Sequence, residues 1–173
     1  EIKKRIETNK IKKPIRVNVW YSKGLLHNAS HAFDLMTFWF GNCKKVKSVK
    51  YIREIKNYGD EVIALANFGS TDVMFIPAWE EFYSHNSLEI ISKNGRLYWN
   101  QNICIWEQLR TNLNENLDYP DAFKVEKIKP DLNNYQFYLL QQLCFALDKK
   151  KSHISTGKEV LSSFKMIEKI LKD

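Results

Sequence analysis

The stretch KVKSVKYIREIKNYGDEVIALANFGSTDVMFIPAW, residues 45–79, contains three runs that are rich in β-branched and aromatic residues. Two short segments separate these runs, NYGD at 57–60 and GST at 69–71, and both have the composition of turns. Short runs joined by such turns are typical of antiparallel strands that are neighbours in one sheet. The stretch therefore predicts that a largely antiparallel sheet forms the centre of this protein.

Further strands are predicted on both sides of this stretch. Residues 15–21, IRVNVWY, place three aliphatic residues at every second position, which is the period of a strand. Residues 86–101 contain two runs around the turn KNG, and this pattern is typical of a β-hairpin. Residues 103–110 and 122–128 add two more strands around the polar loop 111–121.

Helical spacing is found in four segments, at residues 2–8, 25–40, 133–150 and 158–173. Asp131 can cap the third of these, and Val160, Phe164, Ile167 and Leu171 form one apolar stripe on the last. The helix at 25–40 is apolar on nearly all sides, so we expect more than one element to cover it. This order of elements predicts an α+β fold, an open-faced sheet with helices packed on one face.

Length and composition fit one soluble globular domain over residues 1–173. Apolar residues make up 44% of the chain and charged residues 27%, and no apolar run approaches the roughly 20 residues that cross a bilayer. Cys43, Cys104 and Cys144 lie far apart in the sequence, which argues against a disulfide framework and favours a cytoplasmic location.

The charge and the glycine pattern limit the function classes. The net charge of +7 gives weak support for an anionic ligand, although no nucleic-acid-binding signature accompanies it. No GxGxxG or GxxxxGK loop is present in the sequence, so the chain cannot cradle a nucleotide phosphate in the usual way. A self-contained dehydrogenase or kinase is therefore not expected.

The stretch LLHNASHAFDLMTFWFG, residues 25–41, places His27 and His31 four residues apart at the entrance of the predicted apolar helix. Imidazole changes most easily between acid and base near neutral pH, so we expect a buried helix entrance that faces a cleft. Two histidines at this spacing could also ligate a metal. The residues between them are Asn, Ala and Ser and no third ligand is near, so no metal site is expected. For both His27 and His31, a purely structural role in packing remains an alternative.

Taken together, five segments resemble the C-terminal domain of the Gfo/Idh/MocA family of NAD(P)-dependent oxidoreductases. They follow the order of the family's elements and cover essentially the whole chain. The segments are IKKRIETNKIKKPIRVNVWYSKG (2–24), LLHNASHAFDLMTFWFG (25–41), DEVIALANFGSTDVMFIPAW (60–79), NSLEIISKNGRLYWN (86–100) and DKKKSHISTGKEVLSSFKMIEKI (148–170).

The resemblance implies a function and a set of site residues. His31 matches the catalytic histidine of the family and Asp34 its helix-supporting acid, whereas His27 stands where many members have Asp. His27, Asn28 and Lys23 are then expected to bind substrate, a sugar or nucleotide-sugar alcohol. A neutral imidazole at His31, at a helix N-terminus, would accept the hydroxyl proton during its oxidation.

The resemblance also implies partners. NAD or NADP would bind to an N-terminal Rossmann domain that this chain does not contain, so the chain alone is expected to be inactive. Apolar residues point to both faces of the predicted sheet, for example Ile63 and Leu65 against Val62 and Ala64. One face therefore needs a cover beyond the helices, and a homo-oligomer joined through that face is the natural one.

The sequence leaves several alternatives open. The chain could be a non-catalytic α+β module for ligand binding or oligomerisation, or, less favoured, a basic nucleic-acid-binding domain. Asp34 could bond a neighbouring loop instead of taking part in chemistry. The aromatic residues of TFWFG and PAWEEFY are expected in the core or an interface, and His85 and His153 are expected to face solvent.

Overall fold

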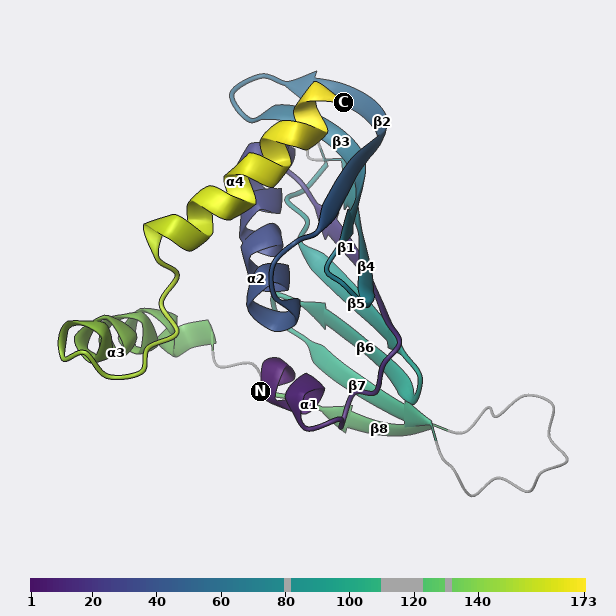
Figure 1. Cartoon of the computed structure of the whole chain (residues 1–173). Helices are drawn as coiled ribbons and strands as arrows, with labels where there is room; N and C mark the ends of the chain where they lie inside the picture. The colour runs from purple at the N-terminus through teal and green to yellow at the C-terminus, as the bar shows by residue number, and fades with distance from the viewer. Residues whose placement is uncertain (80–81, 110–122, 130–131) are drawn as a thin grey trace, which may run out of the picture.

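The computed structural model describes residues 1–79, 82–109, 123–129 and 132–173. Within these residues, eight strands form a sheet in the order β2-β3-β4-β1-β5-β6-β7-β8 (Figure 1). The strands are β1 (Ile15–Tyr21), β2 (Lys45–Ile55), β3 (Gly59–Asn67), β4 (Thr71–Pro77), β5 (Ser87–Ser92), β6 (Gly95–Asn100), β7 (Cys104–Leu109) and β8 (Phe123–Lys127). Neighbouring strands are antiparallel, with the exception of β1 and β4. The predicted α+β fold with a largely antiparallel sheet is confirmed.

The helices also lie where the sequence predicts them. They are α1 (Ile2–Glu7), a π-helix (Gly24–Ala29), α2 (Ser30–Phe40), a short 3-10 helix (Leu132–Asn134), α3 (Tyr135–Leu147) and α4 (Gly157–Lys172). The predicted loop at 111–121 and the predicted cap at Asp131 lie outside the described residues.

The position of β1 in the middle of the sheet explains the one parallel pair. The chain leaves β1 through the π-helix and α2, and it then forms the antiparallel run β2-β3-β4. This run returns to the free edge of β1 with β4 parallel to it, so that Val17 lies opposite Val73 and Val19 opposite Phe75. The helical crossover that a parallel pair requires is therefore the segment that carries the two histidines.

The helices α1, α2 and α4 lie on one face of the sheet (Figure 1). Phe33 of α2 is fully buried, and its ring stacks on that of Phe75 with the centroids 4.7 Å apart and lies 5.8 Å from that of Phe68. Such aromatic contacts add to the stabilisation from apolar burial alone. The sheet and α4 together cover α2, as expected for a helix that is apolar on most sides.

The buried side of α4 differs from the predicted stripe. Ile167 is buried as expected, but Ser163 and Ile170 accompany it, whereas Phe164 is 40% exposed. The contact with α2 and β2 thus turns the helix so that the stripe predicted from sequence lies partly in solvent. Thr156 and Glu159 form a capping box that begins the helix.

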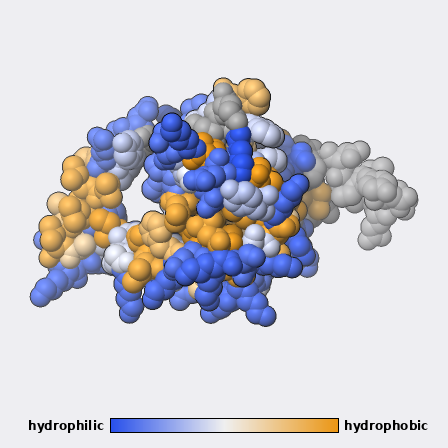
Figure 2. All heavy atoms as spheres, turned by 90° about the horizontal axis from the view of Figure 1, so that it is seen from above, coloured by the Kyte–Doolittle hydropathy of each residue, from blue (hydrophilic) through white to orange (hydrophobic). Residues whose placement is uncertain are grey.

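The helix α3 stands apart from the sheet (Figure 1) and has no buried residue. Its exposed apolar side chains include Phe137, Leu140 and Leu147, and Figure 2 shows hydrophobic residues gathered on its surface. The side chain of Gln142 ties it to the following segment by accepting a hydrogen bond from the backbone N–H of His153, 2.8 Å away.

Tyr21 closes a gap in the sheet close to the start of the π-helix. β3 is paired with β4 only from Ala64 to Asn67, so Val62 has no strand partner on that side. The buried phenol of Tyr21 donates to the carbonyl oxygen of Val62 (2.7 Å) and accepts from its N–H (2.9 Å). These bonds satisfy a buried peptide group and connect β1 to β3 across the end of β4.

Gly24 begins the π-helix in direct contact with the turn between β2 and β3. Its φ is +75°, and a Cβ atom there would lie 2.1 Å from the carbonyl oxygen of Tyr58. Any side chain at this position would push the helix away from the turn. Close approach of two backbones, together with a left-handed conformation, therefore requires glycine here.

We predict that Gly24→Ala lowers the free energy of unfolding by about 3 kcal/mol, because it adds a steric clash to the strain of a positive φ. Gly69→Ala is the matched control, since Gly69 also has a positive φ, +77°, but no atom lies within 4 Å of the place that its new methyl group would take. The control should lose about 1 kcal/mol. Urea unfolding followed by circular dichroism measures the free energy of unfolding of both variants. Equal losses of stability would show that the close contact with Tyr58 adds nothing to the cost of a side chain at position 24.

An ion pair joins α1 to the far edge of the sheet. The buried guanidinium of Arg5 donates to both carboxylate oxygens of Glu126 in β8, at 2.6 and 2.9 Å, and to Glu1 at 2.7 Å. The hydrogen bonds from Arg5 lower the pKa of Glu126 to about 2. The pair connects residues 121 positions apart in the sequence and fixes the N-terminal helix against the core.

We predict that Glu126→Gln lowers the free energy of unfolding at pH 7 by about 1–2 kcal/mol, because it removes the bidentate one of the two carboxylates that pair with the buried Arg5. Glu1 remains as a partner, and the 40% exposure of Glu126 lets water screen the loss. Since the pKa of Glu126 is about 2 when folded and about 4.3 when unfolded, the stabilisation is complete above pH 4.3. It disappears as the pH falls towards 2.

The free energy of unfolding of the wild type, measured between pH 2 and 7, should therefore fall as the pH drops below 4.3. In Glu126→Gln this fall should be smaller. The control is Glu168→Gln, which breaks an exposed pair with Lys172 on α4 and should change the unfolding free energy little. Equal pH profiles for the wild type and Glu126→Gln would contradict the prediction.

Candidate functional site

The helical segment that carries both histidines begins at Gly24 with a π-helix. The backbone of Ala29 is right-handed helical, with φ −67° and ψ −24°, so the π-helix continues into α2 without a break. His31 therefore lies seven residues, more than one turn, inside a continuous helical segment. The expectation that it sits at an open helix N-terminus is wrong, because the unpaired N–H groups of the segment lie near Gly24.

The side chains of His27 and His31 are both exposed, so the expectation of a buried pair is wrong as well. His31 lines an open pocket of about 180 Å³ on the helix side of the sheet. Asn28, Ala32 and Leu35 border the pocket from the helical segment, and residues of β1, β5 and β6 form the opposite wall. We call this cavity the His31 pocket; its remaining lining residues are Val19, Trp20, Asn86, Ser87, Leu88, Trp99 and Gln101.

The His31 pocket combines an apolar wall with a few polar groups. Leu88 is buried, and Leu35 and Trp99 are half-buried, so they form a rigid surface. The ring of His31 makes no hydrogen bond or ion pair with another residue that the structure describes. Together with the amide of Asn28, it can therefore donate to or accept from a small polar molecule. An apolar pocket with a few convergent polar groups has the usual composition of a ligand site.

His27 and Lys23 lie on another side of the helical segment, against the β2–β3 turn. The ring of His27 is 5.7 Å from that of Tyr58, and the Lys23 ammonium is 5.6 Å from the same ring. Of the four predicted site residues, the structure brings His31 and Asn28 together in one pocket and gathers His27 and Lys23 around Tyr58.

Asp34 accepts a hydrogen bond of 2.7 Å from the hydroxyl of Ser155, in the segment that leads into α4. Its side chain does not line the His31 pocket. The alternative in which Asp34 bonds a neighbouring loop is confirmed. The contact holds the start of α4 against α2, and with it the helix that carries His31.

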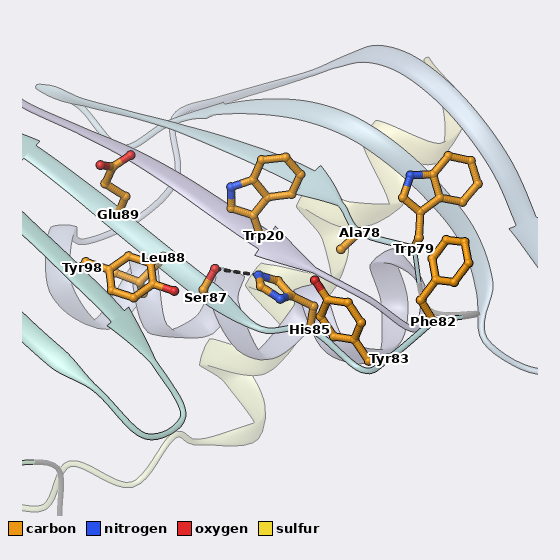
Figure 3. Close-up of a pocket in the computed structure, with 10 residues that line it drawn as sticks. All are labelled: Trp20, Ala78, Trp79, Phe82, Tyr83, His85, Ser87, Leu88, Glu89 and Tyr98. Carbon is orange, nitrogen blue, oxygen red and sulfur yellow. Dashed lines mark hydrogen bonds between the residues drawn. The ribbon is translucent and has the colours of Figure 1, made fainter.

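The structure reveals a second cavity that the sequence interpretation missed, an open pocket of about 490 Å³ (Figure 3). We call it the aromatic pocket and define it by Trp20, Trp79, Tyr98, His85 and Glu89. Trp79 is 61% exposed, so of the two places expected for the PAWEEFY aromatics, the core is excluded for it and an interface stays a prediction. A cluster of aromatic residues beside a histidine, in PAWEEFYSH, was the available sequence signal.

The other two histidines have different surroundings. The half-buried ring of His85 is hydrogen-bonded through Nε2 to the hydroxyl of Ser87, 2.9 Å away, so the expectation that it faces solvent is wrong. The exposed ring of His153 lies edge-on to Phe38, as expected for a solvent-facing residue.

Metal-ligand clusters are absent from the described residues, and phosphate-binding loops are absent from the sequence. Among the described residues, no three His, Cys, Asp or Glu side chains lie close enough to hold a metal ion. The helical segment after β1 opens with the sequence KGLLH, which has one glycine and no phosphate-binding loop. No helix in the described parts of the chain is long and apolar enough to span a bilayer.

No protein-family model and no curated protein sequence matches this chain. Solved structures do match it. A Desulfitobacterium hafniense protein described as a candidate NADPH-dependent oxidoreductase superposes with a TM-score of 0.75 at 10% identity, over 99% of this chain and 57% of its own. Levoglucosan dehydrogenase, in complex with NADH and levoglucosan, gives 0.72 at 13% identity, over 99% and 59%. UDP-N-acetylglucosamine 3-dehydrogenase from Acidithiobacillus ferrooxidans gives 0.65 at 9% identity, again over 99% and 59%.

These identities are low, so the likeness concerns the fold. The chain spans 57% to 59% of the length of these three proteins, which are longer by a further segment. The fold expected from the sequence resemblance is confirmed. The chain has the fold of the C-terminal domain of oxidoreductases of the Gfo/Idh/MocA type.

Proposed function

We propose that this chain is the substrate-binding domain of an NAD(P)-dependent oxidoreductase that acts on a sugar or nucleotide-sugar alcohol. The observation that carries the proposal is the open His31 pocket, in which an exposed imidazole and the amide of Asn28 face the same cavity. The pocket lies in a domain whose structural neighbours are oxidoreductases, two of them named for sugar substrates.

The chemistry of His31 suits this role. Oxidation of an alcohol removes a proton from the hydroxyl group and a hydride from the carbon that bears it. The imidazole of His31 has no protein partner among the described residues, so a lone pair is available to accept that proton. Asn28 can orient the hydroxyl groups, and the apolar wall can exclude water from one side of the ring.

The remaining parts of the enzyme are proposals of the same kind. NAD or NADP would be held by a Rossmann domain elsewhere in the same polypeptide, since this sequence contains no GxGxxG loop. Substrate contacts from His27 and Lys23 stay predictions, as do a homo-oligomer through the open sheet face and a cytoplasmic location. The rival proposal of a non-catalytic module draws on the same lack of a GxGxxG loop, and it predicts no turnover at all.

We predict that His31→Asn in the full-length protein lowers kcat/KM by about 10²- to 10⁴-fold, because it removes the base while keeping a polar side chain at this position. The measurement is NAD(P)⁺ reduction at 340 nm with sugar alcohols and with the substrates named for the structural neighbours, levoglucosan and UDP-N-acetylglucosamine. His153→Asn is the matched control, since His153 is exposed and lies outside the His31 pocket.

The control should keep wild-type activity. Wild-type turnover in His31→Asn would refute the assignment of His31. If no sugar reduces NAD(P)⁺ and the full-length protein binds neither nucleotide in calorimetry, the non-catalytic module is the correct alternative.

A further inference from the structure

We propose that the N-terminal domain of the full-length protein docks on α3. The inference rests on the proposed function, because the partner is the domain that would hold NAD or NADP. The contact surface on α3 consists of Phe137, Leu140, Cys144 and Leu147, which we call the α3 stripe. Their spacing of three, four and three residues places all four on one side of the helix.

The composition of α3 does not suit a helix that is surrounded by water. None of its 13 residues is charged, and none is buried. In the α3 stripe, the side chains of Phe137, Leu140 and Leu147 are 61% to 74% exposed. A helix that is apolar on all sides is normally covered, and a contiguous exposed apolar patch marks an interaction surface. Folding of the described residues therefore leaves the stripe without its cover.

Hydrogen bonds determine the direction in which the α3 stripe faces. The side chain of Gln142 accepts from the backbone N–H of His153, and its carbonyl oxygen accepts from the hydroxyl of Ser152, both at 2.8 Å. Gln142 lies two residues from both Leu140 and Cys144, so at 3.6 residues per turn its side chain points to the opposite side of the helix. The segment after α3 thus holds the helix by one side and turns the stripe outward.

The position of α3 favours the cofactor domain as the partner. α3 lies on the same side of the sheet as α2 and farther from the sheet (Figure 1), and the His31 pocket is on this side as well. Hydride transfer requires a nicotinamide ring beside the substrate, so the domain that holds it must cover the His31 pocket. The predicted homo-oligomer uses the open face of the sheet, on the other side, and leaves α3 uncovered.

The connection between the two domains also starts close to α3. An open cavity of about 410 Å³ is lined by Lys3 of α1, Phe38 of α2 and Ser152, which is bonded to α3. The ammonium of Lys3 lies 4.0 Å from the centroid of the Phe38 ring. A domain that precedes α1 is therefore tethered beside the base of α3. A short tether gives an effective concentration in the millimolar range, which favours this contact over one with a second copy.

The thiol of Cys144 reports on docking, because it belongs to the α3 stripe and is exposed in this structure. We would label the native full-length protein with iodoacetamide and follow each cysteine by peptide mass spectrometry. Cys104 is buried in the sheet and reports on global unfolding in the same sample. We expect Cys144 to react about 100-fold more slowly in the native protein than in urea, because the N-terminal domain covers it.

Two leucine variants test whether the contact lies on α3. Leu140→Gln places a polar group in the stripe without adding a charge beside the thiol, so it should speed the labelling of Cys144 about tenfold and leave Cys104 unchanged. Leu161→Gln is the matched control, since Leu161 is 54% exposed on α4, and it should change neither rate. Equal effects of the two variants, or faster labelling of Cys104 together with Cys144, would overturn the proposal.

The labelling and the turnover assay fail independently of each other. Fast labelling of Cys144 in a full-length protein that reduces NAD(P)⁺ would overturn the docking and leave the proposed function intact. Slow labelling in a full-length protein that binds neither nucleotide would support the docking and refute the proposed function.

A second copy of the chain is the other possible cover for the α3 stripe, and dilution separates it from the proposal. Docking within one polypeptide should keep the labelling of Cys144 slow after about hundredfold dilution. Labelling that becomes fast over this range, as a dimer dissociates in sedimentation velocity, would show that a second copy covers the stripe and would overturn the proposal.

Discussion

The contact between Gly24 and the carbonyl of Tyr58 determines where the helix that carries His31 can lie. Because no side chain separates the two backbones, the chain turns from β1 directly into a helix that rests on the β2–β3 turn. The helix then crosses the sheet towards β5 and β6, and the His31 pocket forms between it and their ends. Packing of α4 on α2 and the hydrogen bond from Ser155 to Asp34 depend on the same placement.

The strands could be predicted from the sequence because the patterns that define them, alternating side chains and turn residues, lie within each segment. Alternation and turn residues in 45–79 define β2, β3 and β4 to within two residues of their observed limits. The parallel pairing of β1 with β4 was not predicted, since both edges of a strand look the same in its own sequence. The π-helix was not predicted either; it begins at Gly24, which lies against a turn that is distant in sequence.

The candidate site also has a part that the sequence could predict and a part that it could not. His31 and Asn28 are three residues apart, so helical geometry alone brings them together and the sequence was sufficient. His27 is equally close in sequence, yet its place beside Tyr58 follows from the tertiary packing of the β2–β3 turn. The aromatic pocket was missed because hydrophobicity predicts burial, whereas Trp79 is held at the surface by Arg53, a partner on another strand. Contacts of this kind leave no periodic signal in the sequence.

The isolation of α3 has a consequence for the local stability of the chain. Helices of fewer than about 12–15 residues are only marginally stable in water, and most gain their stability from tertiary packing. α3 has 13 residues and buries none of them, and the hydrogen bonds that join it to the segment after it include those from Ser152 and His153 to Gln142. Its amide protons should therefore exchange with deuterium by local fraying, orders of magnitude faster than those of β1 and β5, without any opening of the sheet.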